Sequence, residues 1–368
     1  MSDIPTVRTT TLNAFPSGAW AQSSSPAPLQ LSEQWLRSEG GRITPANFVT
    51  SVTASGWSGA VAWMLLDGSE ARSGYATHHL ATGETNKSWE RLLLPCAAIA
   101  MPGANFPAVV MRDGGAEEAA SLWASVEAEC GRYGAQSVVV HNTPSTGSWV
   151  DHVEALRHLS YDPLWQPPEA VLTLEPQRGF LGYVAGLRYQ GRKLVRRERR
   201  TFLEAATVTD QPPSRLLSDE VLRALELRYR KYGHATSLAA VRDRMERVQQ
   251  LPGLRVRIAT LGDDFLGFSA TVADRLTGVL TVRLAGWVPN DCFAYFNLCY
   301  YDPVAQACDL GLHEVHVGTE TYLAKVRRGW GFSSRTAHVK PLVDVGSDFS
   351  QEVEALSSGL ESRFRDSW

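Results

Sequence analysis

The sequence lacks the patterns that identify several large classes of protein. Its five cysteines are an odd number without a Cys-x-x-Cys pair, which argues against a zinc site or a disulfide framework and indicates a reducing compartment. No apolar run approaches the roughly 20 residues of a membrane span, and the N-terminus lacks a basic segment followed by an apolar core. Convincing Gly-x-Ser-x-Gly, His-Glu-x-x-His and Walker patterns are also absent. We therefore expect a cytoplasmic protein without a bound metal or cofactor.

Length and charge set the next limits. A chain of 368 residues exceeds the usual domain of about 100 to 200 residues, and its 44% apolar content can fill ordinary cores, so we expect two domains. Lys and Arg number 36 while Asp and Glu number 39, so the charges nearly cancel. The overall field gives no steering toward nucleic acid or an acidic membrane, and we predict no membrane partner. Any site for a polyanion must be local.

The order of the expected elements divides the sequence into three parts. Residues 1–32 are rich in Ser, Thr and Pro and predict a loosely ordered segment. Residues 33–175 and 176–368 each have the order strands, helix, strand, helix, strand, and the composition changes from apolar to basic between them. GAQSVVVHN, from Gly134, and GLHEVHVGT, from Gly311, both place a helix-ending glycine before a Val-x-Val strand. We predict two copies of one α+β unit, each a mixed, mostly antiparallel sheet flanked by helices.

The segment 295–341 carries a resemblance to a known family. An aromatic-rich expected strand, YFNLCYY, precedes a helix that ends at a glycine, then the strand EVHVG, a helix with one lysine, a Gly-Trp-Gly turn and a closing strand. This order resembles the C-terminal motif of the tandem GNAT-fold proteins that include the Fem-type aminoacyltransferases and their natural-product relatives. The first unit matches only in its order of elements. The resemblance implies two tandem GNAT-like units that form an amide with an amino acid taken from aminoacyl-tRNA.

The choice of donor depends on a second motif. The acetyl-CoA pyrophosphate loop of ordinary GNAT enzymes reads Gln/Arg-x-x-Gly-x-Gly, whereas the nearest match, VRRGWG at 326–331, begins with Val and lies on a different helix. We therefore expect aminoacyl-tRNA as the donor and a small amine or a peptide amine as the acceptor. Two alternatives stay open: an acyl-CoA-dependent N-acyltransferase, and a non-catalytic scaffold whose tryptophan-rich surfaces contact a partner.

Lys325 is the first candidate for chemistry. On a helix it shares a face with Thr321 and Tyr322, so these side chains can point together into a cleft, and Tyr322 is a candidate substrate contact. The resemblance implies that Lys325 binds a phosphate or carboxylate of a substrate, or stabilises the transferring carbonyl. A solvated lysine near a helix C-terminus is the alternative. Arg328 and its neighbour Arg327 can hold a phosphate there or act as helix-end cations.

Polar side chains interleave with aromatic ones at 294–301, which we predict to be a strand. Alternation would place Tyr295 and Asn297 on one face. Asn297 and Tyr301 are the candidates to contact the carbonyl of the donor, with Tyr295 as a further substrate contact and Tyr301 as a catalytic group. Core packing is the alternative for the aromatic residues.

His316 is the candidate proton acceptor. Alternation in the expected strand EVHVG puts it on the same face as Glu314, which could orient a histidine of near-neutral pKa. A structural histidine is the more common case. His78 and His79 are adjacent in an expected loop, but no further metal ligands accompany them.

The basic run at 188–200 is the candidate phosphate site. Contacts to nucleic-acid phosphates need Lys and Arg side chains, and we expect them to reach the acceptor end of tRNA. The helical spacing predicts charges spread around the surface, so a solvated helix face is an equal alternative. The residues proposed to bind tRNA are Arg192, Lys193, Arg196, Arg197 and Arg200.

Overall fold

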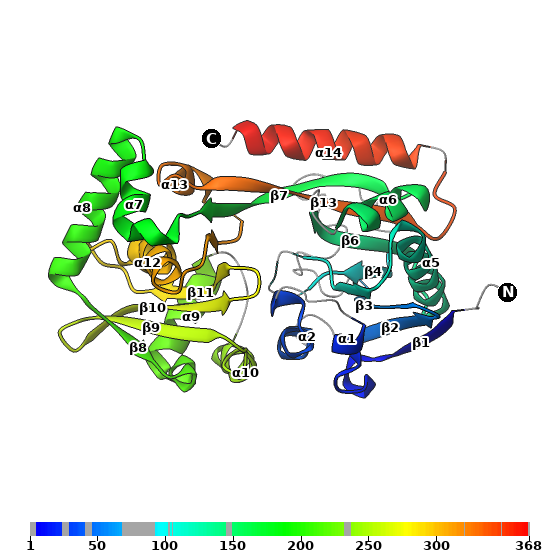
Figure 1. Ribbon diagram of the computed structural model, residues 1–368, viewed down its shortest axis with the longest axis horizontal. Helices are drawn as coiled ribbons and strands as arrows, with labels where there is room; N and C mark the ends of the chain where they lie inside the picture. The colour runs from blue at the N-terminus through cyan, green and yellow to red at the C-terminus, as the bar shows by residue number, and fades with distance from the viewer. Residues whose placement is uncertain are drawn as a thin grey trace. The chain divides into compact units, whose positions relative to one another are not determined.

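The chain forms two units, one of which contains both ends of the sequence. Unit 1 comprises Met1–Pro168 and Ser334–Trp368, and unit 2 comprises Glu169–Ser333 (Figure 1). The predicted boundary near residue 175 lies close to the first crossing between the units. The computed structural model describes residues 5–23, 29–40, 46–67, 93–101, 104, 106–144, 149–231, 237–319, 321–346 and 348–366. The pair His78 and His79 therefore lies outside the described residues.

Two predictions about the chain ends are wrong. Residues 334–368 belong to unit 1, because strand β13 (Gly331–Pro341) pairs antiparallel with β6 (Ser137–Pro144). Helix α14 (Phe349–Asp366) packs against the same sheet through Val353. The N-terminal segment is also not wholly loose, since β1 (Thr6–Thr11) pairs antiparallel with β2 (Asn47–Ala54). Long-range strand pairing decides both cases, and a local sequence pattern carries little information about it.

The sheet of unit 1 has the strand order β1-β2-β3-β4-β6-β13, with β5 paired to β3. Only β4 and β6 are parallel, and helix α5 lies between β5 and β6 in the chain. Gly134, with a positive φ of 88°, follows the end of α5 and leads into β6 as predicted. The remaining elements of this unit are β3 (Trp57–Leu66), β4 (Cys96–Ile99), β5 (Val109–Arg112), η1 (Leu12–Ala14), α1 (Ala19–Gln22), η2 (Leu29–Leu31), α2 (Glu33–Gly40), α5 (Ala116–Arg132) and α6 (Val150–His158).

The strand order in unit 2, which contains β7 from Glu169 onward, is β7-β12-β11-β10-β9-β8, and again one of the described pairs, β11 and β12, is parallel. The helical segment after β11 ends before Gly311, which has a positive φ of 72° and leads into β12. This match between the units confirms the predicted pair of mixed, mostly antiparallel sheets flanked by helices. The strands are β7 (Asp162–Thr173), β8 (Thr207–Gln211), β9 (Leu254–Leu261), β10 (Asp264–Asp274), β11 (Val279–Trp287) and β12 (Glu314–His316).

Helices cover both faces of the unit 2 sheet. A Cβ on Gly267 would lie 2.8 Å from Leu298 in the segment after β11, whereas a Cβ on Gly286 would lie 3.2 Å from Ala224 in α9. Glycine therefore allows close packing of helix on sheet at both places. The other elements are η4 (Pro176–Arg178), α7 (Gly179–Gly186), α8 (Tyr189–Ala205), η5 (Pro213–Leu217), α9 (Asp219–Lys231), α10 (Leu238–Val248) and α13 (Tyr322–Val326).

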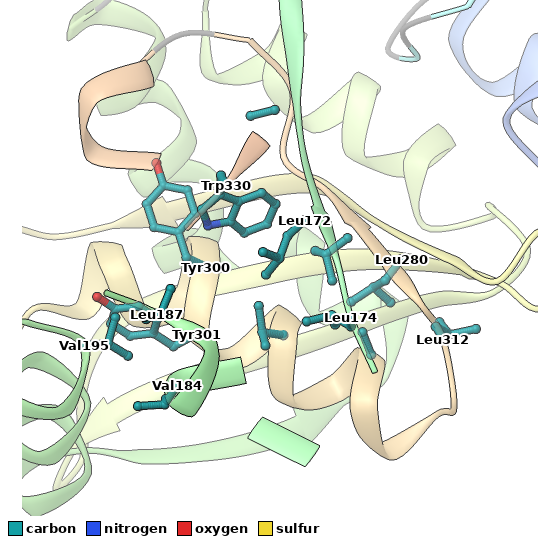
Figure 2. Packing of buried hydrophobic residues seen from close by; sticks show 14 residues of the cluster. Leu172, Leu174, Val184, Leu187, Val195, Leu280, Tyr300, Tyr301, Leu312 and Trp330 are labelled. Atoms are coloured by element: carbon teal, nitrogen blue, oxygen red, sulfur yellow. The ribbon is translucent and has the colours of Figure 1, made fainter. Parts of the chain in front are cut away.

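The predicted strand at 294–301 is wrong, because this segment is helical. Helix α11 (Ala294–Phe296) continues through a π-helical turn, η6 (Asn297–Tyr301), into α12 (Asp302–Asp309). Tyr300 and Tyr301 pack with Val304 and Ala307 in one buried cluster, which also contains Leu172 (Figure 2). Packing at helical spacing thus overrides the strand preference of the aromatic residues.

Candidate functional site

Unit 2 contains a cavity with a volume of about 1320 Å³, which we call the large cavity. Its walls come from the end of β7, from α7, from the first turns of α8 and from the turn 326–330. The apolar part, which we call the floor, consists of Leu172, Leu174, Leu187 and Trp330, all members of the buried cluster in Figure 2. The charged part, which we call the rim, consists of Glu175, Arg178, Arg188 and Arg327.

Glycines bring the walls of this cavity together. A Cβ on Gly191 in α8 would lie 3.0 Å from the carbonyl oxygen of Arg327, so glycine allows the helix to approach the turn. Gly329 has a φ of 82°, and a Cβ there would lie 2.4 Å from Leu187. The close fit holds Arg327 at the rim, where its side chain is exposed. In contrast to Lys325 and Arg328 beside it, Arg327 has no side-chain partner within the described part of the chain.

A second, much smaller cavity of about 80 Å³ lies where β11 extends beyond β12. The parallel pairing ends at Thr281 and His316, and β11 continues to Trp287. Three hydroxyl groups meet beside the opening: Tyr295 and Tyr300 lie 2.7 Å apart, and each lies 3.3 Å from Oγ1 of Thr321. Burial raises the pKa of Tyr300 well above the usual range of a phenol, and the neighbouring Tyr295 and Cys299 raise it further. This phenol therefore stays protonated.

Lys325 borders the small cavity, but its ammonium group is already bound. Nζ donates to the carbonyl oxygens of Gly318 and Thr319 at 2.9 Å and of Val317 at 3.4 Å, and the residue is only 2% exposed. Three carbonyl partners match the three donors of an ammonium group. The geometry therefore gives Lys325 the role of holding the loop after β12, and it does not support the predicted contact with a donor phosphate.

A buried network replaces the predicted substrate contacts at Tyr301 and Arg328. Nη2 of Arg328 lies 2.8 and 2.7 Å from the two carboxylate oxygens of Glu198, and Nε donates to the Tyr301 hydroxyl at 2.7 Å. Tyr301 in turn donates to Glu198. All three residues are at most 2% exposed, so the network joins α8 to η6 and to the turn after α13 without facing either cavity.

Asn297 is likewise a structural residue in this fold. Its side-chain amide donates to the carbonyl oxygens of Glu198 at 3.2 Å and Phe293 at 3.0 Å, and its oxygen accepts from Arg199 at 3.3 Å. Tyr322 contacts Phe332 edge-on with ring centroids 5.3 Å apart and borders neither cavity. Among the four residues predicted to bind substrate (Tyr295, Asn297, Tyr322 and Arg328), Tyr295 alone borders one of these two cavities.

His316 lies between two carboxylates. Its Nε2 is 3.1 Å from Glu314, as the predicted alternation requires, and its Nδ1 is 3.2 Å from Glu169. Burial by itself lowers the pKa of His316, but the charge and hydrogen bond of Glu169, followed by those of Glu314, raise it to about 9. The near-neutral pKa expected for a proton acceptor is thus wrong, because the ring is an imidazolium at neutral pH and has no free site for a proton.

Replacing His316 with Gln is expected to destabilise the protein more at about pH 6 than at about pH 10. The folded-state pKa of about 9 lies above the ordinary value of 6.5, so the folded state binds this proton more tightly. The resulting stabilisation, about 3 kcal/mol, is fully present below pH 6.5 and is lost as the pH rises through 9. Urea unfolding of both proteins at the two pH values measures the difference. An equal loss at both would contradict the assignment.

The basic run forms an exposed face on α8. Lys193, Arg196, Arg197 and Arg200 are exposed and have the spacing i, i+3, i+4, i+7 of a single helix face, which we call the basic face. The predicted spreading of the charges around the helix is therefore wrong. Arg192 is half-buried instead, and it donates to the carbonyl oxygens of Ala185 and Leu187 at the end of α7.

Sequence reasoning missed the residues that build the large cavity. Three glycines of α7, at 179, 182 and 186, border it with the i, i+3, i+7 spacing of one helix face, which is a signal visible in the sequence. Glu198 is the one acidic residue within RKLVRRERR, which could also have marked it as a buried partner. The role of Glu169 depends on strand pairing and leaves no comparable local signal.

Comparison with solved structures establishes the fold. FemX aligns with 92% of this chain and 97% of its own, at 8% identity and a TM-score of 0.59. A tandem GNAT protein from the clavulanic acid biosynthesis pathway aligns with 93% of this chain and 100% of its own, at 10% identity and a TM-score of 0.52. The sequence matches no family model and no curated protein. The fold resembles that of Fem-type and tandem GNAT proteins, as predicted, and identities this low show the fold alone.

None of the helices described is long and apolar enough to cross a membrane. Within the same residues, no group of three or more His, Cys, Asp or Glu side chains is placed to hold a metal ion.

Proposed function

We propose that the protein transfers an aminoacyl group from aminoacyl-tRNA to a small amine or a peptide amine. The observation that carries the proposal is the continuity between the basic face and the large cavity. A groove along the basic face is bordered by Tyr189, Gln190 and Leu194, and the same three residues border the large cavity. If the phosphates of a tRNA strand lie on the basic face, the end of that strand can thus reach the mouth of the cavity.

The local chemistry suits the end of an RNA strand. Tyr189 is 72% exposed at the cavity mouth, where an aromatic ring can stack on an unpaired base. The whole chain has a formal net charge of −3, so a broad RNA footprint lacks support, whereas a contact limited to the acceptor end needs only the local charges.

The reaction itself requires positioning more than covalent catalysis. The acceptor nitrogen attacks the ester carbonyl, the bond from that carbon to the tRNA ribose oxygen breaks, and the amine proton passes to the departing ribose oxygen or to water. Because the ester is already activated, the protein has to align the reactants and stabilise the developing oxyanion. Arg188 and Arg327 are two exposed cations of the rim that can donate to this oxygen.

Two observations weigh against the alternatives. The segment 288–293 before α11, VPNDCF, contains no glycine, so it offers no flexible backbone loop to surround a CoA pyrophosphate. The scaffold alternative relied on tryptophan-rich surfaces. Within the described part of the chain, each tryptophan is buried or half-buried, which indicates a packing role.

A transfer assay tests this function and separates the donors. The protein is incubated with total tRNA charged with radiolabelled amino acids and with a low-molecular-weight cell extract as the source of amines. The expected result is a labelled small-molecule amide that disappears when the tRNA is digested beforehand with RNase. Formation of an amide only after addition of acyl-CoA would support the CoA-dependent alternative. Absence of product with either donor would contradict acyl transfer.

A further inference from the structure

We propose that the large cavity selects an aminoacyl group with an apolar side chain. This inference rests on the proposed function, because it assumes that the aminoacyl end of tRNA enters the cavity. The observation behind it is the separation of the lining into an apolar floor and a charged rim. Such a division allows one part to hold a hydrophobic side chain while the other contacts the polar groups around the ester.

The floor is the part of a hydrophobic cluster that borders the cavity. Leu172, Leu174, Leu187 and Trp330 are 6%, 8%, 8% and 4% exposed, and they belong to the main hydrophobic cluster of unit 2. An apolar ligand group placed on them gains affinity by about fourfold for each buried methylene. A glycyl group has no side chain to place there, and a charged side chain would lose hydration on the same surface.

The rim supplies partners for the remaining polar groups. Among the described residues that border the cavity, Glu175 is the single acidic one. Its carboxylate attracts an α-ammonium group, whereas the three arginines repel it. Its exposed ion pair with Arg178, at 3.4 Å, is weak enough to exchange for a ligand. Arg188 and Arg327 remain for the ester carbonyl and the terminal phosphate.

The cavity is large enough for more than an amino acid, and Gly186 leaves one part of its wall without a side chain. A volume of about 1320 Å³ exceeds the 300 to 1,000 Å³ typical of small-ligand pockets, so it can hold a terminal nucleoside together with its amino acid. Gly186, the last residue of α7, has no positive φ, and a Cβ added there meets nothing within 4 Å. Neither backbone conformation nor packing requires glycine at this position. The glycine leaves space at the cavity wall that a side chain would otherwise fill.

The test uses stable mimics of the charged tRNA end. Adenosines that carry leucine, phenylalanine, glycine, aspartate or lysine through a 3′-amide bond are titrated by calorimetry. The leucyl and phenylalanyl compounds are expected to bind at least about tenfold more tightly than the glycyl compound. Gly186→Phe, which fills the wall, should abolish this preference. The matched control is Gly359→Phe on exposed α14, where an added Cβ also meets open space and the preference should persist.

The possible outcomes separate this inference from the proposed function. Equal binding of all five compounds, or tighter binding of the aspartyl or lysyl compound, overturns the apolar preference. If the protein still binds tRNA through the basic face in that case, the proposed function stands and only the selectivity is wrong. If neither the mimics nor tRNA bind, the proposed function fails as well.

Discussion

Replacing Glu198 with Ala is expected to lower the free energy of unfolding by about 3–5 kcal/mol, because it leaves a buried charge without a partner. The carboxylate of Glu198 accepts from Arg328 and Tyr301, and all three residues are at most 2% exposed. Tyr183 also donates to the carbonyl oxygen of Arg328, so the network supports the turn that borders the large cavity. Chemical denaturation measures the loss.

The control for this prediction lies on the same helix. Glu204 is exposed, and its Oε1 lies 3.9 Å from Nε of Arg200, which makes a weak ion pair. Glu204→Ala should therefore change the free energy of unfolding by at most about 0.5 kcal/mol. Combining Glu198→Met with Arg328→Met should recover part of the loss, since the double variant removes both buried charges. A loss below about 1 kcal/mol for Glu198→Ala would show that the network does not stabilise the fold.

Neutralising the basic face is expected to weaken tRNA binding about 100-fold at low salt. The variant changes Lys193, Arg196, Arg197 and Arg200 to Gln, and these residues account for up to four phosphate contacts. At about 0.7 counterions released for each contact, the slope of log affinity against log salt should fall by about 3. Filter-binding titrations at several salt concentrations measure both quantities.

A second variant controls for the change in total charge. Arg223, Arg230, Arg275 and Arg363 are exposed arginines that border neither the groove nor the large cavity, and their replacement by Gln removes the same number of charges. This control should keep the affinity and the salt slope of the natural protein. Equal weakening by both sets would mean that binding reflects total charge and that α8 is no specific site.

The sequence predicted those features that depend on local pattern. The helix expected to end at Gly134 forms as α5, ending at Arg132, and the short strand expected in EVHVG forms as β12. In both cases the apolar spacing and a nearby glycine agree with the final packing. The repeated helix-glycine-strand join correctly indicated two similar units.

The site was harder to predict because its partners are distant in sequence or belong to the backbone. Lys325 binds three carbonyl groups, which no residue pattern specifies. Arg328 pairs with Glu198, 130 residues earlier, so its spacing at the end of α13 gave no indication of burial. The prediction for the segment containing Tyr301 was wrong for another reason. Its aromatic residues favour a strand, whereas tertiary packing stabilises a helix with a π-helical turn.

The most direct test of the central claim asks where the aminoacyl end of tRNA lies. A tRNA charged with the photoreactive apolar amino acid p-benzoylphenylalanine is irradiated with the protein, and mass spectrometry identifies the attached residues. The account predicts adducts in α7 or in the turn 326–330, which border the large cavity. Adducts confined to the small cavity near Tyr295 and Thr321, or none above an uncharged-tRNA control, would contradict it.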